Sequence, residues 1–421
     1  MPSVSHVAGG TPLGLERQVA ENDAGSSFLP SMIRWRWGVQ QLWGGIMSYG
    51  RHIHLTAMAS AFLGLGSVSP AGAQAPVVSS PLEAGTSALP IVHITKRPGS
   101  PPVIVVIAQT NTVLSDFVVP YGVLAQSGAA KVIAVNMVDG PLKAGPLALL
   151  PDMTAAEFDR QYPDGADYVI VPATADKHGE EVRWLRSQHR QGAALVSICD
   201  GVELLAEAGV LDGRRATGHW ASLKDRRTRY PKVTWLTDLR YVEDGDVASS
   251  AGVSAALPIS LALIQTIAGA EVARATADRL GVISWDAKHD SAVFKVRSDD
   301  KVVHRANMAA RSDVVALAVR DGEDEVALSL HAEAWSRTMR DDVRLVSDNG
   351  GPVRLRGGLS VETTAASSVT PDVLIALDGS APAGTALPAA FDRIAQRYGP
   401  GSARLAALGM EYPWGDLKVS Q

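Results

Sequence analysis

Short apolar runs alternate with amphipathic stretches along the middle of the chain. The apolar runs cover residues 103–108, 131–135, 167–171 and 193–198. A run that is apolar at every position is typical of a strand buried on both faces of a parallel sheet. The stretches between them have helical periodicity and cover residues 120–127, 180–190 and 202–208. This alternation predicts an α/β fold in which helices flank a parallel sheet.

The pattern continues with a short strand at residues 246–250 and a long helical stretch. That stretch is apolar over residues 255–268 and polar over the following segment to Asp278. The change in polarity predicts two successive helices rather than one uniform element.

The C-terminal third repeats the order of the first half of this pattern. An apolar run at 314–319 is followed by one at 343–347, then by a Gly-Pro turn with a second strand at 350–361, and by a strand at 371–377. The first half has the same strand, Gly-Pro turn and strand order around Gly140-Pro141. We therefore expect a smaller C-terminal α/β half-repeat that packs on the first domain or on another subunit, because a half sheet exposes its edges. The alternative is that the similarity is a coincidence, since many α/β proteins share this order of strands and turns.

The first part of the chain has the features of an export signal. An apolar run at 53–68 follows Arg51 and His52 and precedes Ala71-Gly-Ala73, a small-x-small cleavage pattern. The run is shorter than the roughly 20 residues of a bilayer span. Cleavage near Ala73 predicts a periplasmic or secreted protein with a Pro/Ser-rich linker. The residues before Met47 indicate either a start assigned too early or a tail on a membrane anchor.

The composition predicts a large hydrophobic core and shows that the chain has a single cysteine. Hydrophobic residues make up 46% and charged residues 20% of 421 residues, and the net charge is -5. The single cysteine excludes an internal disulfide, and the net acidity implies no overall attraction to nucleic acid. The lone thiol is then either a buried small apolar group or a reactive one.

The position of Cys199 favours the reactive alternative. It directly follows the fourth apolar run, and Asp200-Gly201 leads into the helical stretch at 202–208. A nucleophile on a strand-to-helix turn stands clear of the backbone and faces the positive end of the helix dipole, which favours a thiolate. Ligands of open α/β sheets bind beyond the carboxyl ends of the strands, where this turn lies.

The residues around this turn resemble a known family signature. Residues 197–220 read Ser-Ile-Cys-Asp-Gly-Val-Glu-Leu-Leu-Ala-Glu-Ala-Gly-Val-Leu-Asp-Gly-Arg-Arg-Ala-Thr-Gly-His-Trp. This segment is similar to the ThiJ/PfpI signature, in the branch of isonitrile hydratases and of the sensor domains of AraC-type regulators. Residues 250–256 resemble the later glycine turn of that branch, and Asp116 with residues 120–124 resembles its first acidic loop. The resemblance covers residues 102–294 and implies a class I glutamine amidotransferase-like parallel-sheet sandwich.

The resemblance also implies roles for individual residues. Cys199 would be the nucleophile, Asp116 would hold or relay a proton beside the thiol, and His219 would be a second acid/base. Backbone N–H groups at the turn around Asp200 and Gly201, and after Val171-Pro172, would face an oxyanion. The alternatives are an inert buried thiol, a helix N-cap for Asp116 and a structural role beside Trp220 for His219.

Two departures from the family pattern concern the same site. Ala173 and Thr174 stand where the family usually has two glycines, so side chains crowd the second oxyanion donor. Asp200 stands where a small hydroxyl residue is usual, and a neighbouring carboxylate raises the pKa of a thiol. Asp200 could instead act as a base. Pro258 replaces an acid that the branch tends to carry in its late helix.

Metal and cofactor sites are not predicted. His178 could reach the cleft but is more typical of a solvated loop. Residues 285–290 gather His289 with two acids, although no regular ligand spacing supports a metal site and a surface turn fits better.

These observations predict three segments: an N-terminal extension with signal and linker at 1–101, a ThiJ/PfpI-like domain at 102–294 and a C-terminal partial repeat at 295–421. The expected function is a cysteine-dependent hydratase or hydrolase of a small electrophile such as an isonitrile. The alternative is a non-catalytic periplasmic module that binds a ligand or senses redox state. We expect a small-molecule ligand and no nucleic-acid partner, because no helix-turn-helix pattern follows the domain. The family resemblance also implies a homodimer.

Overall fold

The computed structural model describes residues 93–175 and 179–417, which all fall in one compact unit. Its first sheet has seven strands in the order β10-β11-β7-β6-β1-β2-β5. All neighbours pair in parallel except β10 and β11. The strands are β1 (Val103–Ala108), β2 (Lys131–Asn136), β5 (Met153–Thr154), β6 (Tyr168–Val171), β7 (Ala194–Ser197), β10 (Tyr241–Asp244) and β11 (Val247–Ser250). The predicted α/β fold with a parallel sheet is confirmed.

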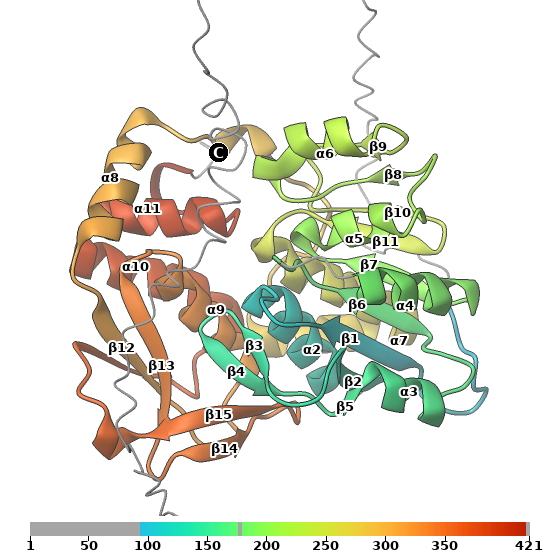
Figure 1. Ribbon diagram of the computed structural model, residues 1–421, viewed down its shortest axis with the longest axis horizontal. Helices are drawn as coiled ribbons and strands as arrows, with labels where there is room; N and C mark the ends of the chain where they lie inside the picture. Colours follow the sequence, from blue (N-terminus) through green and yellow to red (C-terminus); the bar gives the residue numbers. More distant parts are fainter. Residues whose placement is uncertain (1–92, 176–178, 418–421) are drawn as a thin grey trace, which may run out of the picture. The chain divides into compact units, whose positions relative to one another are not determined.

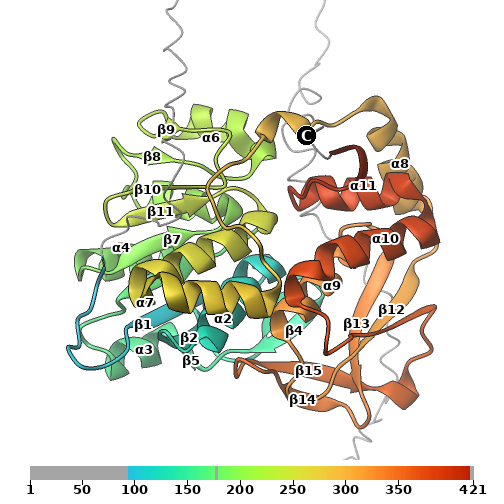
Figure 2. The same cartoon turned by 180° about the vertical axis from the view of Figure 1, so that it is seen from behind.

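Helices cover both faces of this sheet (Figures 1 and 2). On one face Ile104 and Val106 of β1 join a core with α2 and α7, while on the other Val103 and Val105 join a core with α3, α4 and α5. The two-sided burial explains why these strands are apolar at every position. The helices are α2 (Leu114–Ser127), α3 (Ala155–Gln161), α4 (Gly179–Arg190), α5 (Val202–Glu207), α6 (Leu223–Arg229) and α7 (Ala256–Leu280). A small separate sheet pairs β8 (Arg215–Ala216) with β9 (Thr234–Trp235).

Helix α7 contains the predicted change of helix. Gly269 has φ 88° and interrupts the helical backbone, so an apolar helix meets a polar one at this residue. The stretch Val253–Leu280 is long and apolar enough to cross a bilayer, but 56% of its apolar window is buried inside the protein, as in a core helix.

The C-terminal region builds a second sheet in the order β16-β12-β13-β15-β4-β3, with β14 paired to β15. Its strands are β3 (Leu142–Ala144), β4 (Leu147–Leu150), β12 (Asp313–Ala318), β13 (Asp341–Ser347), β14 (Gly351–Arg354), β15 (Ser360–Ala365) and β16 (Val373–Ala376). Its helices are α8 (Ser298–Ala309), α9 (Glu325–Ser336), α10 (Ala386–Tyr398) and α11 (Pro400–Gly409). Strands β3 and β4 come from the first segment, so this sheet joins the two segments of the chain.

The arrangement of β12, α9, β13 and β16 repeats that of β1, α2, β2 and β6. Residue i of β1 pairs with residue i+28 of β2, as Val103 with Lys131, and Asp313 of β12 pairs with Asp341 of β13 at the same separation. Strand β12 lies between β13 and β16, as β1 lies between β2 and β6. In both copies a hairpin follows the second strand.

The two copies meet through equivalent elements. Strand β4 pairs antiparallel with β15, and α2 packs against α9 (Figure 1). Figure 2 shows α9 and α2 side by side from behind. The half-repeat therefore covers the first helix of the domain, which carries Asp116.

One helix boundary differs from prediction. Helix α2 begins at Leu114, six positions before the predicted start, and includes Pro120 in its interior. Proline is common in the first turn of a helix, which made Pro120 look like a start, yet here the chain tolerates the missing donor. The predicted signal segment, the cleavage near Ala73, the alternative start at Met47 and most of segment 1–101 lie outside the described residues, so export stays a prediction.

Candidate active site

Cys199 sits on a strained turn at the carboxyl end of β7. It has φ 57° and opens the short 3-10 turn Cys199–Gly201 that leads into α5. A positive φ costs energy for a residue with a Cβ and is a feature that functional sites retain. The Cys199 amide donates to the Ala251 carbonyl at 3.0 Å, which fixes the turn to the segment after β11.

Gly201 allows this turn to approach β6. A Cβ at this position would lie 2.0 Å from the Val171 carbonyl oxygen and 2.8 Å from the Pro172 carbonyl carbon. Both contacts are with backbone atoms, which cannot rotate away. The glycine is therefore required by a close approach between the turn and the end of β6.

The thiol is fully buried and is not a ready thiolate. Burial raises the pKa of the Cys199 thiol well above its ordinary value, and electrostatic interactions with Asp116 and Asp200 raise it further. The Arg337 guanidinium and a hydrogen bond from the Asp200 amide lower it by less. The thiolate expected from the helix dipole is thus outweighed, and the resting group at neutral pH is the thiol.

Asp116 supplies a buried carboxyl group that interacts electrostatically with this thiol. It lies in the first turn of α2 with no exposed surface, and its Oδ2 accepts a hydrogen bond from the Ala173 amide at 3.3 Å. Its Oδ1 has no hydrogen-bond partner among the described residues. Burial raises the pKa of Asp116 well above its ordinary value, and Glu333 adds to the rise. The N-cap position of α2 belongs to Val113, so Asp116 is not a helix cap.

The segment after β6 does not offer the predicted oxyanion donor. The Ala173 amide donates to Asp116, and the Ala173 carbonyl accepts from the Val113 amide at 2.8 Å. Thr174 is buried, and its hydroxyl lies 3.5 Å from the Gln109 side-chain nitrogen. The backbone N–H assigned to an oxyanion by the family resemblance is here used to hold the carboxyl group.

Asp200 is held by an ion pair with Arg226 and a hydrogen bond from Ser222, and its role as a base stays a prediction. Its Oδ1 accepts from Arg226 at 2.6 Å, and its Oδ2 accepts from the Ser222 hydroxyl at 2.5 Å. The Arg226 side chain is almost fully buried and stacks over the Trp235 ring at 5.2 Å. Asp200 therefore ties the cysteine turn to α6.

His219 is a buried, neutral imidazole on the other side of the turn. Its Nδ1 accepts from the Ala221 amide at 3.3 Å, which assigns the proton to Nε2, and Nε2 has no hydrogen-bond partner among the described residues. Burial lowers the pKa of His219, while Glu411 opposes that change. The ring lies 5.8 Å from that of Trp220 and packs against Gly252, next to the carbonyl that holds Cys199.

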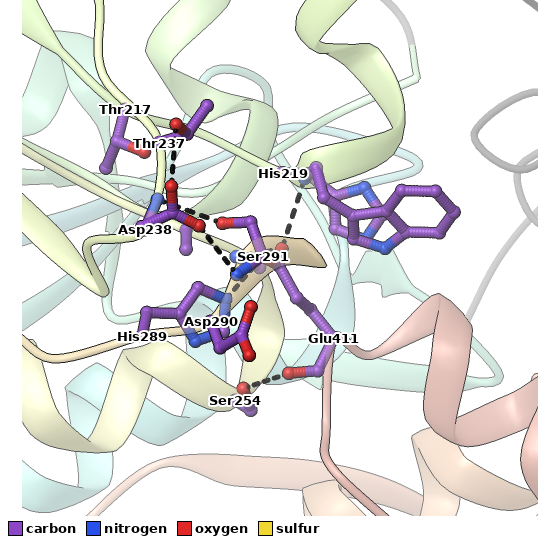
Figure 3. Close-up of polar contacts among 12 residues, drawn as sticks. Thr217, His219, Thr237, Asp238, Ser254, His289, Asp290, Ser291 and Glu411 are labelled. Carbon is purple, nitrogen blue, oxygen red and sulfur yellow. Dashed lines mark hydrogen bonds and ion pairs between the residues drawn. The ribbon is translucent and has the colours of Figure 1, made fainter. Parts of the chain in front are cut away.

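Glu411 is a site residue that sequence reasoning missed. It is buried with φ 53°, and its Oε2 accepts from the Gly252 amide at 2.8 Å and the Trp220 amide at 3.2 Å. Its Oε1 is 2.7 Å from His289 Nε2. Figure 3 shows His289 and His219 on either side of Glu411. Burial would raise the pKa of Glu411, but the hydrogen bond from His289 and the electrostatic interactions with both histidines hold it below its ordinary value.

Glu333 and Arg337 of the C-terminal repeat were missed as well. Both are buried, and each is linked electrostatically to Asp116. Their local signal was an acid and a base four positions apart, next to an apolar helical stretch at 326–335. Such a pair is also typical of an exposed helix face, so the sequence alone does not separate the two.

The sequence also offered two weaker site candidates, His178 and the segment 285–290, and their outcomes differ. His178 lies outside the described residues. The segment 285–290 is not a surface turn throughout, because Trp285 is buried and His289 contacts Glu411. No group of three or more metal-ligating side chains occurs within residues 93–175 and 179–417.

Comparison with known proteins finds similarity to one family over the part of the chain that contains Cys199. The family model described as DJ-1/PfpI matches residues 102–266. The "Isonitrile hydratase" of Pseudomonas putida is 31% identical over 113 residues, which are 26% of this chain and 48% of that protein. The crystal structure of Drosophila melanogaster DJ-1beta aligns with a TM-score of 0.39 and 24% identity, over 43% of this chain and 98% of that one.

The comparisons also correct one expectation. The "HTH-type transcriptional regulator CdhR" of Pseudomonas aeruginosa is 40% identical over 92 residues, which are 22% of this chain and 27% of the regulator. Two further regulators from the same species, ArgR and GbdR, match at 38% and 34% identity. The chain thus spans less than a third of the length of the regulators it matches. The prediction that excluded a nucleic-acid partner was wrong, since relatives of this domain are transcriptional regulators.

Proposed function

We propose that this chain hydrates a small, uncharged electrophile at Cys199, with isonitriles as the substrate class. The match of the DJ-1/PfpI family model to residues 102–266 and the similarity to an isonitrile hydratase support the proposal. The observation that carries the proposal is the pairing of a buried thiol on a strained turn with a buried carboxyl group that has one unpartnered oxygen. Buried polar atoms in native proteins are rarely left without a partner, so Oδ1 of Asp116 is suited to a ligand.

The protonation state of the pair fits addition to an isonitrile. Burial raises both pKa values, so the proposal takes the carboxylic acid of Asp116 and the thiol of Cys199 as the reacting forms. Asp116 gives its proton to the terminal carbon of R–N≡C, the sulfur bonds to that carbon, and the thiol proton passes to the Asp116 carboxylate. The product is a thioimidate, R–N=CH–S–Cys199, and no net charge has entered the buried site.

Water then releases the product with the same two residues. Water adds to the thioimidate carbon, while Asp116 protonates the nitrogen and recovers a proton from the water. The carbon–sulfur bond breaks as the carbonyl forms, and the hydroxyl proton returns through Asp116 to the sulfur. The sum is R–N≡C plus water giving the formamide R–NH–CHO, with the enzyme unchanged.

Amide hydrolysis fits the site less well. It develops an oxyanion that needs preorganised donors, and the Ala173 amide is occupied by Asp116. The buried thiol favours ligands that are small and uncharged, because the surrounding side chains must move to admit them.

A ligand-binding module without turnover is the second candidate. The raised pKa of Cys199 favours it, because a protonated thiol is a weak nucleophile. The same raised pKa argues against redox sensing, since oxidation also proceeds through the thiolate. Under this alternative an isonitrile or a related small molecule binds and no formamide appears.

The Asp116→Asn variant tests the proposal through the pH profile of formamide production from ethyl isonitrile. The acid form of Asp116 exists below its raised pKa, so the rate of the parent should be constant below that pKa and fall as pH rises through it. In Asp116→Asn the rate should fall by a factor of about 10² to 10⁴, which is the usual contribution of a general acid. Formamide can be followed by NMR.

Asp152→Asn is the matched control for this experiment. Asp152 accepts a hydrogen bond from the Ala134 amide at 2.8 Å and also has a raised pKa, but it does not contact the cysteine turn. It should keep the rate of the parent. Equal rates for Asp116→Asn and the parent, or binding without formamide, would contradict the hydratase.

A further inference from the structure

Helix α9 of the C-terminal repeat reaches the residue next to Asp116. Glu333 Oε2 accepts hydrogen bonds from the Ser115 amide at 2.7 Å and the Ser115 hydroxyl at 2.9 Å. Both residues are buried, and no other carboxylate bonds the Ser115 amide or hydroxyl among the described residues. The first turn of α2, which presents Asp116, is therefore anchored by a residue 218 positions away in the chain.

Arg337 orients that carboxylate and brings a positive charge into the site. Its Nε and Nη2 donate to Glu333 Oε1 at 2.9 and 2.5 Å, and its Nη1 donates to the Gly409 carbonyl at 3.2 Å. The guanidinium is fixed by three hydrogen bonds to two acceptor atoms and interacts electrostatically with both Cys199 and Asp116. Buried charges of this kind are costly to retain, and a buried ion pair is weak evidence for a purely stabilising role.

The segment of the repeat around Gly409 also contacts the residues on the other side of Cys199. Two residues beyond Gly409, Glu411 accepts hydrogen bonds from the amides of Gly252 and Trp220. Gly252 follows the Ala251 carbonyl that holds Cys199, and Trp220 follows His219. Two carboxylates of the repeat, Glu333 and Glu411, thus clamp the segments on both sides of the thiol.

We propose that Glu333 and Arg337 are positioning residues of the Cys199 site, so that the C-terminal half-repeat is an integral part of it. Glu333 fixes the backbone that presents Asp116, and Arg337 holds Glu333 and supplies the buried positive charge near the sulfur. This inference rests on the proposed function in taking Cys199 and Asp116 as the reacting pair. It adds that this pair works only with the repeat in place.

The charges around the pair set the direction of each expected effect. The thiolate form of Cys199 is disfavoured by Asp116 and Asp200 and favoured by Arg337. Asp116 is influenced by Glu333, Arg337 and Asp200, of which only Arg337 favours its ionised form. Removing Arg337 should therefore suppress the thiolate, and removing the charge of Glu333 should favour the Asp116 carboxylate.

Alkylation of Cys199 tests the role of Arg337 without any turnover. The chain has one cysteine, so the rate of iodoacetamide incorporation at pH 8, followed by intact mass, reports a single thiol. Arg337→Met should slow alkylation, about tenfold for each unit by which the pKa of the thiol rises. Arg337→Lys should recover part of the rate of the parent. If Arg337 only stabilised the fold, Arg337→Met would speed alkylation instead, because loosened packing would expose the thiol.

Infrared titration of the Asp116 carboxyl group tests the proposed influence of Glu333 on its ionisation. The carboxylic C=O band of Asp116 is identified by its loss in Asp116→Asn. In Glu333→Gln this band should disappear at lower pH than in the parent, because a neighbouring negative charge has gone. A midpoint that is not lower in Glu333→Gln, or alkylation of Arg337→Met that is as fast as in the parent, would overturn the inference.

Glu325→Gln is the matched control in both measurements. Glu325 is a buried carboxylate on the same helix that contacts α2 through Gln126 at 2.9 Å, at the other end of the α2–α9 contact. It should leave both readouts at the values of the parent. If the alkylation rate of Arg337→Met and the infrared midpoint of Glu333→Gln shift as expected but the parent makes no formamide, the inference stands and the hydratase proposal is refuted. The failure of one proposal can therefore be told from the failure of the other.

Discussion

Cys199→Ala is expected to abolish isonitrile hydration. The proposed route passes through a bond between the Cys199 sulfur and the isonitrile carbon, and alanine offers no atom that can form it. Removing the nucleophile of a covalent mechanism costs about 10⁴-fold or more, which leaves only what binding and the remaining polar groups supply. The rate of formamide appearance at saturating isonitrile measures the loss.

Folding should survive this substitution. The thiol accepts a hydrogen bond from the Asp200 amide, but Cys199 is held chiefly by its own amide, which donates to Ala251 and is unchanged in the variant. Ser197→Ala is the control, since Ser197 is an equally buried residue two positions earlier on β7. It should hydrate isonitriles at the rate of the parent. Turnover by Cys199→Ala at a rate near that of the parent would refute a covalent route.

Gly201→Ala is expected to have the largest effect on stability. The added methyl group would lie 2.0 Å from the Val171 carbonyl oxygen, which also accepts a hydrogen bond from the Ile198 amide at 3.0 Å. Separating the cysteine turn from β6 breaks that bond and disturbs a core strand. The free energy of unfolding should fall by about 3 kcal/mol or more, at the upper end for overpacking. Urea denaturation followed by circular dichroism measures it.

Gly179→Ala is the matched glycine for this comparison. Among the described residues, a Cβ at Gly179 would meet only the end of the flexible Arg183 side chain at 3.3 Å, and the residue starts α4. Alanine there should be neutral or stabilise by about 0.4–1 kcal/mol. If Gly201→Ala unfolds at the same urea concentration as Gly179→Ala, the close approach of the turn to β6 is not required.

The sequence was sufficient for the sheet and for the cysteine turn. Strands buried on both faces leave continuous apolar runs, and β1 was predicted with its observed bounds, Val103–Ala108. Gly269 divides the long late helix where its polarity changes. Cys199 stands between an apolar strand and a helix in the chain itself, so its position needed no tertiary information.

The remainder of the site depends on contacts that no local pattern contains. Glu333 bonds Ser115 across 218 positions, and Glu411 bonds Gly252 across 159. The ionisation of Cys199 was also beyond sequence reasoning. The helix dipole is visible in the order of residues, but complete burial and the nearness of the Asp116 carboxyl group are properties of the folded chain.

The most direct test of a nucleophilic Cys199 is the mass of the intact chain during a single turnover with ethyl isonitrile. The mechanism predicts a transient species heavier by one isonitrile, located by peptide mapping on Cys199. This species should decay as formamide appears and should be absent in Cys199→Ala. Formamide production with no such species at any quench time, or with the added mass on another residue, would contradict the account.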